Sequence, residues 1–281
     1  THLEISVKDY ISKSNHFKHM VKGYKSTCID FDCTEVPIDP YFLGLWLGDG
    51  SSESASITTM DTEIREYLYA FASKCGLTIR VKFGSRTAPT YNLTRSKFTR
   101  NAGDEWRNPL RAGLVSCNVL HNKHIPKCYL VNDRNTRLNV LAGLLDSDGH
   151  LNTGNCYEIS SKWKHMAEQI CWLAQSLGFR TSLTKVTNKC QTGTFTAYKT
   201  IITGSGLENI PVLLPRKKAS PRKQIKDALR SGIKVTPQGI GEYFGFELDG
   251  DGLFLLEDFT VTHNSPYVAE FVKLLVDSGE K

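Results

Sequence analysis

Two segments of the chain are almost continuously apolar, and each ends in Asp-Gly. The first is FLGLWLGDG at residues 42–50 and the second is LAGLLDSDG at residues 141–149. Asp49 and Asp148 therefore lie 99 residues apart. Segments of this length that are apolar on all sides predict buried helices, each with a carboxylate at its C-terminal end.

The similarity continues downstream of both segments at an offset of 102 residues, as in Ile57 and Ile159. An amphipathic helix is predicted from about Thr62 to Lys74, with a counterpart in the second copy. The apolar positions are Ile64, Leu68 and Phe71 in the first helix and Met166, Ile170 and Leu173 in the second. Gly76 and Gly178 mark the ends of the two helices. The chain is therefore predicted to contain an internal duplication.

Alternating strands follow each amphipathic helix. In the first copy Ile79, Val81 and Phe83 alternate with Arg80 and Lys82. In the second copy, residues 194–201 alternate in the same way between two faces. A sheet with helices on one face and Arg, Lys, Thr and Tyr on the other fits the major groove of DNA. The alternative is a half-exposed sheet that contacts only water.

The two apolar helices also carry small residues four positions apart. These are Gly44 and Gly48 in the first and Gly143 and Ser147 in the second. Small residues allow two helix backbones to approach closely, which would bring the two terminal aspartates together. Crowded carboxylates resist ionisation unless a cation is present, and their hard oxygen ligands favour Mg²⁺ or Ca²⁺. Metals held between paired carboxylates support hydrolysis of phosphodiesters.

Composition excludes several classes of protein. The chain is 40% hydrophobic and 23% charged, as in ordinary globular domains, and no apolar run is long enough to span a membrane or to form a signal peptide. We therefore expect an intracellular protein. The eight cysteines contain no CxxC pair and predict reduced thiols. Cys28 and Cys33 lack the further ligands that a zinc site needs.

Charge is arranged in blocks along the chain. Residues 80–137 contain twelve Lys or Arg and three acids, and residues 162–230 contain thirteen and three. Residues 242–281 reverse the balance, with two basic residues and nine acids. The basic blocks predict a polyanionic partner, and double-stranded DNA fits the predicted sheets. A solvated basic surface that binds nothing is the alternative.

The two Asp-Gly blocks resemble the motifs of LAGLIDADG homing endonucleases, and the duplication resembles the single-chain, two-motif type. The resemblance covers roughly residues 36–235. It implies an α+β fold made of two pseudo-twofold αββαββα units, with sheets that straddle the major groove of a long target site. It also implies a monomer that cleaves both strands to leave 3′ overhangs. Asp49 and Asp148 are then the metal-binding catalytic acids, with Mg²⁺ as cofactor and Mn²⁺ as a substitute.

Members of this family often add one basic residue to each half. Lys123 is the first candidate, and Lys217 or Lys218 in PRKKASPRK is the second, with Lys217 preferred. A lysine there would stabilise developing negative charge. The alternative for this basic run is a nuclear-targeting or phosphate-binding patch. The expected DNA-binding residues are Arg80, Lys82, Arg95, Lys97, Lys185 and Lys199.

The acidic C-terminal segment, residues 243–265, ends in Val-Thr-His-Asn-Ser and is similar to the C-terminal splice junction of an intein. Cyclisation of Asn264 would break the following peptide bond, with assistance from His263. Ser265 would supply the hydroxyl nucleophile. The expected fold therefore adds part of a β-rich, Hint-type splicing domain.

The resemblance to inteins is incomplete. Inteins begin with a Cys or Ser nucleophile and a β-rich half, whereas Thr1-His2 resembles at most a remnant of the Thr/His block. Gly252 stands where inteins usually carry a histidine. We therefore expect that this chain does not splice alone, although splicing is possible in a longer precursor or in trans with an N-terminal half. Residues 267–276 are predicted to form an amphipathic helix in host sequence.

The expected organisation has four parts. Residues 1–35 are a remnant of the N-terminal splicing domain, and residues 36–235 are the endonuclease, with repeats at about 40–135 and 138–230. Residues 236–264 are the C-terminal splicing segment, and residues 265–281 belong to the host protein. The compartment, nuclear or cytoplasmic, depends on that host. Two other functions remain open: a splicing element with an inactive nuclease, and a nucleic-acid-binding intron maturase.

Overall fold

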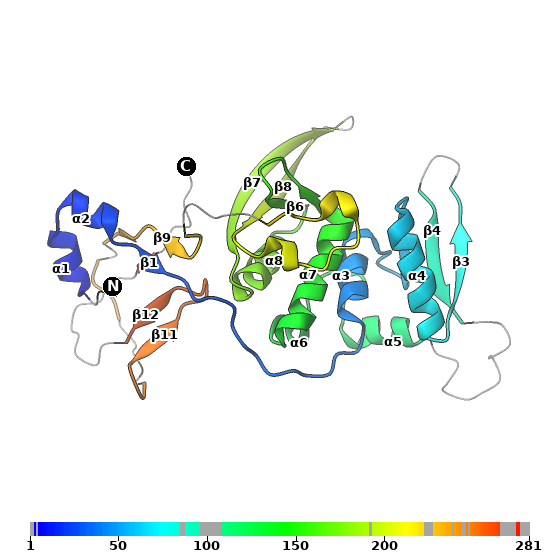
Figure 1. Cartoon of the computed structure of the whole chain (residues 1–281), viewed down its shortest axis with the longest axis horizontal. Helices are drawn as coiled ribbons and strands as arrows, with labels where there is room; N and C mark the ends of the chain where they lie inside the picture. The colour runs from blue at the N-terminus through cyan, green and yellow to red at the C-terminus, as the bar shows by residue number, and fades with distance from the viewer. Residues whose placement is uncertain are drawn as a thin grey trace.

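The computed structural model describes most of the chain. The described residues are 3, 5–84, 88–95, 108–190, 193–221, 227–237, 239–242, 246, 248–264 and 274–275. Two apolar helices lie side by side at the centre, with one antiparallel sheet to either side (Figure 1). A smaller body made from both ends of the chain lies beyond the second sheet (Figure 1). The fold is α+β, as predicted.

The first copy contains α3 (Pro40–Asp49), α4 (Thr62–Lys74) and α5 (Pro109–Ser116), with strands β2 (Ser56–Thr58), β3 (Thr78–Lys82) and β4 (Thr90–Thr94) in the order β2-β4-β3. The second copy contains α7 (Arg134–Asp148) and α8 (Lys164–Ser176), with strands β5 (Gly149–Leu151), β6 (Tyr157–Ser161), β7 (Arg180–Cys190) and β8 (Gly193–Thr203) in the order β5-β6-β8-β7. A short helix, α6 (Lys127–Leu130), joins the copies.

The duplication predicted from the sequence is present in the strand pairing. Gly149 pairs with Ile159 in the second sheet, and an isolated bridge joins Gly50 to Ile57 in the first. Helices α4 and α8 have the same length and end before Gly76 and Gly178, which have positive φ angles of 64° and 87°. A residue in this left-handed conformation ends each helix. Glycine occupies the position because an L side chain would be strained there.

The two copies depart from the αββαββα pattern in opposite ways. The first copy reduces its first strand to the single bridge at Gly50. The second copy has no described final α-helix. In its place are two 3-10 turns, η3 (Leu207–Asn209) and η4 (Pro215–Lys217). After η3, the backbone amides of Leu213 and Leu214 donate hydrogen bonds to the Asp146 carboxylate of α7 rather than to carbonyl oxygens of a regular helix.

The core lies between the central helices and the two sheets. Trp46, Leu145 and Ile57 are among its fully buried side chains, and the same cluster continues into both copies. Burial on this scale explains why residues 41–47 of α3 and 140–145 of α7 are almost continuously apolar. Among the described residues, no helix combines the length and the apolar character that crossing a bilayer requires. Seven cysteines of the described residues are free thiols: Cys28, Cys33, Cys75, Cys117, Cys128, Cys156 and Cys171.

The smaller body combines N-terminal and C-terminal segments. It contains α1 (Val7–Ser12), α2 (Asn15–Met20), β1 (Gly23–Tyr24), β9 (Arg230–Ser231), β10 (Lys234–Val235), β11 (Leu253–Leu255), β12 (Val261–His263) and β13 (Leu274–Leu275). β1 pairs with β9, and Lys25 forms an ion pair with Asp258 at 2.8 Å. Residues 230–235 therefore pack with this body, so that the expected boundary at residue 235 falls inside it. Of the helix predicted at residues 267–276, only residues 274–275 are described. The prediction is wrong there, because Leu274–Leu275 form strand β13, which pairs with β10.

A buried arginine attaches the smaller body to the second copy. Arg137, near the start of α7, is 0% exposed. Its guanidinium donates to the carbonyl oxygens of Ile29 and Ser176, and it lies 4.9 Å from the ring centre of Phe31. Phe31 in turn stacks on Trp172 of α8, whose ring also contacts Phe259. The segment before α3 is thus packed against the second copy.

Candidate active site

The close approach of α3 and α7 places the two aspartates at one end of the helix pair. A Cβ atom added to Gly44 would lie 2.1 Å from the Val140 carbonyl oxygen, and one added to Gly143 would lie 2.2 Å from the Tyr41 carbonyl oxygen. The Cβ position of Gly48 is 3.2 Å from Asp148 Oδ2. The predicted stripe of small residues therefore forms the helix contact and brings Asp148 next to the end of α3.

Asp49 and Asp148 are the last residues of α3 and α7, respectively. Burial, together with the charge of Asp148, raises the pKa of Asp49 to about 6. Burial also raises the pKa of Asp148, although its side chain is exposed at the edge of a concave surface. Two carboxylates that repel each other in a partly desolvated site would be stabilised in their ionised form by a cation.

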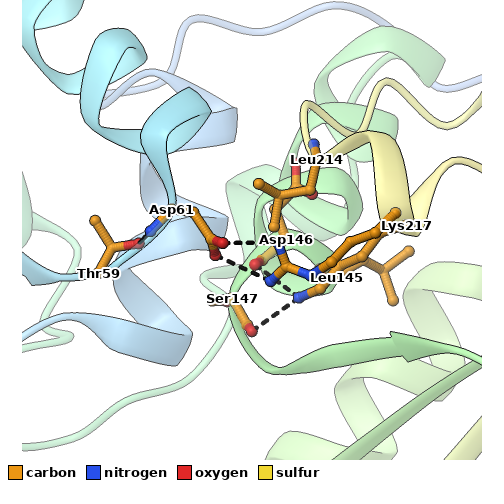
Figure 2. Close-up of polar contacts among 8 residues, drawn as sticks. Thr59, Asp61, Leu145, Asp146, Ser147, Leu214 and Lys217 are labelled. Carbon is orange, nitrogen blue, oxygen red and sulfur yellow. Dashed lines mark hydrogen bonds and ion pairs between the residues drawn. The ribbon is translucent and has the colours of Figure 1, made fainter. Parts of the chain in front are cut away.

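Two lysines bind the C-terminal ends of these helices. Lys123 Nζ donates to the carbonyl oxygens of Gly48 at 3.0 Å and Gly50 at 2.7 Å. Lys217 is 7% exposed, and its Nζ donates to the carbonyl oxygens of Leu145, Asp146 and Ser147 at 2.8–3.1 Å, as Figure 2 shows. The C-terminal end of a helix carries partial negative charge, so a cation there is favourable. Lys218, the other sequence candidate, makes no such contact in the described part of the chain.

Of the two lysines, the one from the other copy has the larger effect on the pKa of each aspartate. Lys123 is the larger of the two lysine effects that oppose the raised pKa of Asp148, whereas Lys217 is the larger for Asp49. Burial lowers the pKa of both lysines, and Asp148 is the carboxylate that opposes this most at Lys123. We refer to Asp148 with Lys123 and Asp49 with Lys217 as the crossed acid–lysine pairs, although at Lys217 itself the charges of Asp146 and Asp61 have larger effects on the pKa than that of Asp49.

A cleft of about 200 Å³ lies beside the first of these pairs. Asp148 and Lys123 both line it, together with Gly48 at the helix contact and residues 159–163 from the end of β6. A phosphate group that entered it would meet both a carboxylate and an ammonium group.

Asp146 is a buried carboxylate to which the sequence analysis assigned no role. It is 2% exposed, and its oxygens accept hydrogen bonds from the Tyr41 hydroxyl at 2.8 Å and from the amides of Leu213 and Leu214. Its carboxylate is thus fully engaged within the protein. The sequence carried one signal for this residue, because the first copy has Leu47 at the corresponding position.

The candidate DNA-binding residues lie on different faces. Arg80 and Lys82 are exposed on β3, opposite to the face of Ile79 and Val81. Lys199 is half-buried and forms an ion pair with Glu158. Lys185 is exposed, and it pairs across the hairpin with Tyr198 on the face that also carries Leu183 and the buried Thr200.

The expectation of a single Arg-Lys-Thr-Tyr face in each copy is therefore wrong for the second copy. Side chains alternate along a strand, so Lys185 and Lys199 cannot share a face in this register. Thr200 faces α8, where Cys171 Sγ lies 3.6 Å from its hydroxyl. In the first copy, Arg95 is half-buried and follows the row of Tyr91 and Leu93. Lys97 lies outside the described residues.

The splice-junction residues lie in the smaller body. His263 ends β12, which pairs with β11. The backbone N–H of Asn264 donates to the Gly252 carbonyl oxygen at 2.7 Å. Gly252 has a φ of 67°, and a Cβ there would lie 2.9 Å from His263 Nε2. The His263 side chain therefore occupies the space that a residue larger than glycine would need. Ser265, Thr1 and His2 lie outside the described residues.

Comparison with known proteins shows a similarity to one family over part of this chain. Residues 124–224 match the family model for homing endonucleases. The matched region contains α7 with Asp148, as well as Lys217.

Two curated proteins are similar over most of the chain. The replicative DNA helicase DnaB of Mycobacterium intracellulare is 30% identical over 254 residues, which are 87% of this chain and 38% of the helicase. The catalytic subunit of the V-type proton ATPase of Candida tropicalis is 24% identical over 272 residues, which are 80% of this chain and 25% of that protein. The chain thus spans well under half the length of either relative.

Similar solved structures include mesophilic variants of the homing endonuclease I-DmoI, with a TM-score of 0.38 and 17% identity over 59% of this chain and 88% of that chain. A structure of I-DmoI with DNA and Ca has a TM-score of 0.38 and 16% identity, and covers 59% of this chain and 83% of that chain.

Proposed function

We propose that the chain is a site-specific, metal-dependent LAGLIDADG endonuclease that cleaves both strands of a long DNA site and leaves 3′ overhangs. The observation that carries this proposal is the pairing of Asp49 and Asp148 at the ends of two closely packed helices, each end also bound by a lysine. The homing endonuclease match over residues 124–224 supports the same reaction class.

The two aspartates fit a divalent cation such as Mg²⁺, with Mn²⁺ as a substitute. In the described part of the chain, their side-chain oxygens accept no hydrogen bond, whereas those of Asp146 are fully used. No cluster of three or more His, Cys, Asp or Glu suited to a metal occurs among the described residues, so DNA phosphate and water would complete the coordination. The bound ion would stabilise negative charge at the scissile phosphate.

The lysines act on the same charge from the protein side. Lys123 and Lys217 hold their ammonium groups at fixed positions through two and three carbonyl oxygens. A preorganised cation beside a phosphate stabilises charge that develops in the transition state. Since each lysine is coupled to the aspartate of the other copy, we infer that each strand is cleaved by one crossed acid–lysine pair.

The nuclease is further proposed to lie within an intein. The C-terminal segment carries His263, Asn264 and Ser265, and the hairpin of β11 and β12 holds the first two. The two relatives are a DNA helicase and the catalytic subunit of a proton ATPase, and this chain covers only 38% of the first and 25% of the second. A segment that occurs in such different proteins is expected of a mobile insertion rather than of a part of either host's activity.

Selection from a randomised plasmid library tests the nuclease directly. In the presence of Mg²⁺ we expect linear plasmids that share one long site with 3′ overhangs, because the two crossed pairs act on opposite strands. Sequencing of the ligated ends identifies the site. Omission of the metal is the control and is expected to leave the plasmids circular. A protein that binds the library and never linearises it would favour the maturase function instead.

The raised pKa of Asp49 predicts a pH dependence for cleavage. Asp49 has a pKa of about 6 before a cation binds, so protonation competes with the metal as the pH falls; at a sub-saturating Mg²⁺ concentration the single-turnover rate should drop about tenfold between pH 7 and pH 5. The measurement uses saturating protein, with DNA binding checked at each pH by gel shift. A rate that stays constant from pH 5 to pH 8 would contradict this prediction.

A further inference from the structure

The lysine-bearing segment of each copy is attached to the outer helix region of the other copy. The segment with Lys123 lies against α8, and the segment with Lys217 lies against the start of α4. These attachments join parts of the chain far apart in sequence, and the proposed reaction does not by itself require them. They are made by different kinds of bonds.

On the Lys123 side, the attachment is an uncharged amide pair. Gln169 of α8 accepts from the Ile125 amide at 2.8 Å and donates to the Ile125 carbonyl oxygen at 3.3 Å. His165, one turn earlier on α8, has its Nε2 3.1 Å from the Lys123 carbonyl oxygen. The backbone of Lys123 is therefore fixed relative to the second copy, while its ammonium group binds the end of α3 in the first.

On the Lys217 side, the attachment is an ion pair. The guanidinium of Arg216 donates to both carboxylate oxygens of Asp61, at 2.6 and 3.0 Å. Asp61 directly precedes α4 in the first copy. Figure 2 shows that Asp61 reaches from the start of α4 towards the end of α7. Paired bonds of this type fix direction as well as distance. Lys217, the next residue, is thereby placed at the end of α7.

We propose that Gln169 and the Arg216–Asp61 ion pair are positioning elements, each serving the cleavage of one DNA strand. The inference rests on the proposed function. Gln169 and Asp148 belong to the same copy, and Gln169 holds the lysine that shares a cleft with Asp148. Asp61 and Asp49 likewise belong to one copy, and Asp61 holds the segment of Lys217. Each lysine-bearing segment is thus bound by a side chain of the other copy.

Loss of one attachment should therefore affect one strand. A displacement of about 1 Å in a catalytic group can cost on the order of 10²-fold in rate. We expect Arg216→Met to slow cleavage of one strand at least about tenfold and to leave the other strand within about twofold of the parent. Gln169→Met, which keeps the side-chain length and removes both hydrogen bonds, should slow the opposite strand. Nicked plasmid accumulates in both variants.

The experiment follows both strands of the selected target duplex, each labelled with a different dye, under single-turnover conditions. Arg216→Lys restores a positive partner for Asp61 and should recover most of the lost rate. Matched controls are Glu168→Ala, which alters the neighbouring residue of α8, and Arg230→Ala, which removes an exposed ion pair with Asp227. Both controls should cleave the two strands as the parent does.

The outcomes separate the two proposals. Slowing of opposite strands by the two variants supports the inference, and equal slowing of both strands by either variant overturns it, because a general loss of structure has no strand preference. Slowing of the same strand by both variants also overturns it. A parent protein that cleaves neither strand contradicts the proposed function and this inference together.

Discussion

Replacement of Asp49 or Asp148 by asparagine is expected to reduce DNA cleavage by at least about 10³-fold while DNA binding is retained. Asparagine keeps the shape of the side chain and removes the charge that holds a divalent cation. A metal contributes several kcal/mol of transition-state stabilisation in hydrolysis of this kind, and about 4 kcal/mol corresponds to that factor. Single-turnover cleavage of the selected target by the parent and by each variant measures the loss.

The control for this experiment is Asp32→Asn. Asp32 is exposed and lies in the segment before α3, away from the helix ends. This variant should cleave like the parent. Gel shifts in Ca²⁺ should show similar affinity in all variants, because the sheets rather than the two aspartates supply most of the DNA contacts. Equal cleavage by the parent and by both Asp49→Asn and Asp148→Asn would reject the assignment of the catalytic acids.

Replacement of Gly44 by alanine is expected to destabilise the protein by at least about 3 kcal/mol, since the added methyl group would overlap backbone atoms of α7. Its Cβ would lie 2.1 Å from the Val140 carbonyl oxygen and 3.0 Å from the Leu144 amide nitrogen. Backbone cannot rotate away as a side chain can, so the two helices would have to separate. Thermal unfolding should show a midpoint lower by roughly 6–12 °C.

Gly143→Ala tests the same contact from the other helix, because its Cβ would lie 2.2 Å from the Tyr41 carbonyl oxygen. Gly232→Ala is the matched control, since nothing lies within 4 Å of its added Cβ. The control should unfold within about 0.5 kcal/mol of the parent. Unchanged midpoints in Gly44→Ala and Gly143→Ala would mean that the helices do not pack as closely as described.

Local patterns in the sequence predicted much of the fold. The apolar segments, the helix from Thr62 to Lys74 and the glycines that end α4 and α8 all depend on residues near one another in the chain. The approach of α3 to α7 was also predictable, because the small-residue spacing occurs in both copies. The same reasoning identified Asp49 and Asp148 as neighbours.

Contacts between distant segments could not be predicted in this way. Arg216 and Asp61 are 155 residues apart, and nothing in the basic run that contains Arg216 indicates that its partner is Asp61. The faces of Lys185 and Lys199 depend on the register of β7 and β8, because a shift of one residue in pairing exchanges the two faces of a strand. The periodicity of residues 267–276 suits a helix, yet the pairing of β13 with β10 overrides it at Leu274–Leu275.

The contact of Arg137 with the segment before α3 has a consequence for the evolution of this protein. Loss of the proposed nuclease portion would remove Arg137 and Trp172 together, leaving Phe31 and Phe259 exposed to water. A shortened descendant would need compensating substitutions at these two aromatic positions to stay soluble. Lineages that carry a reduced form should therefore show polar residues there, whereas full-length forms keep the rings.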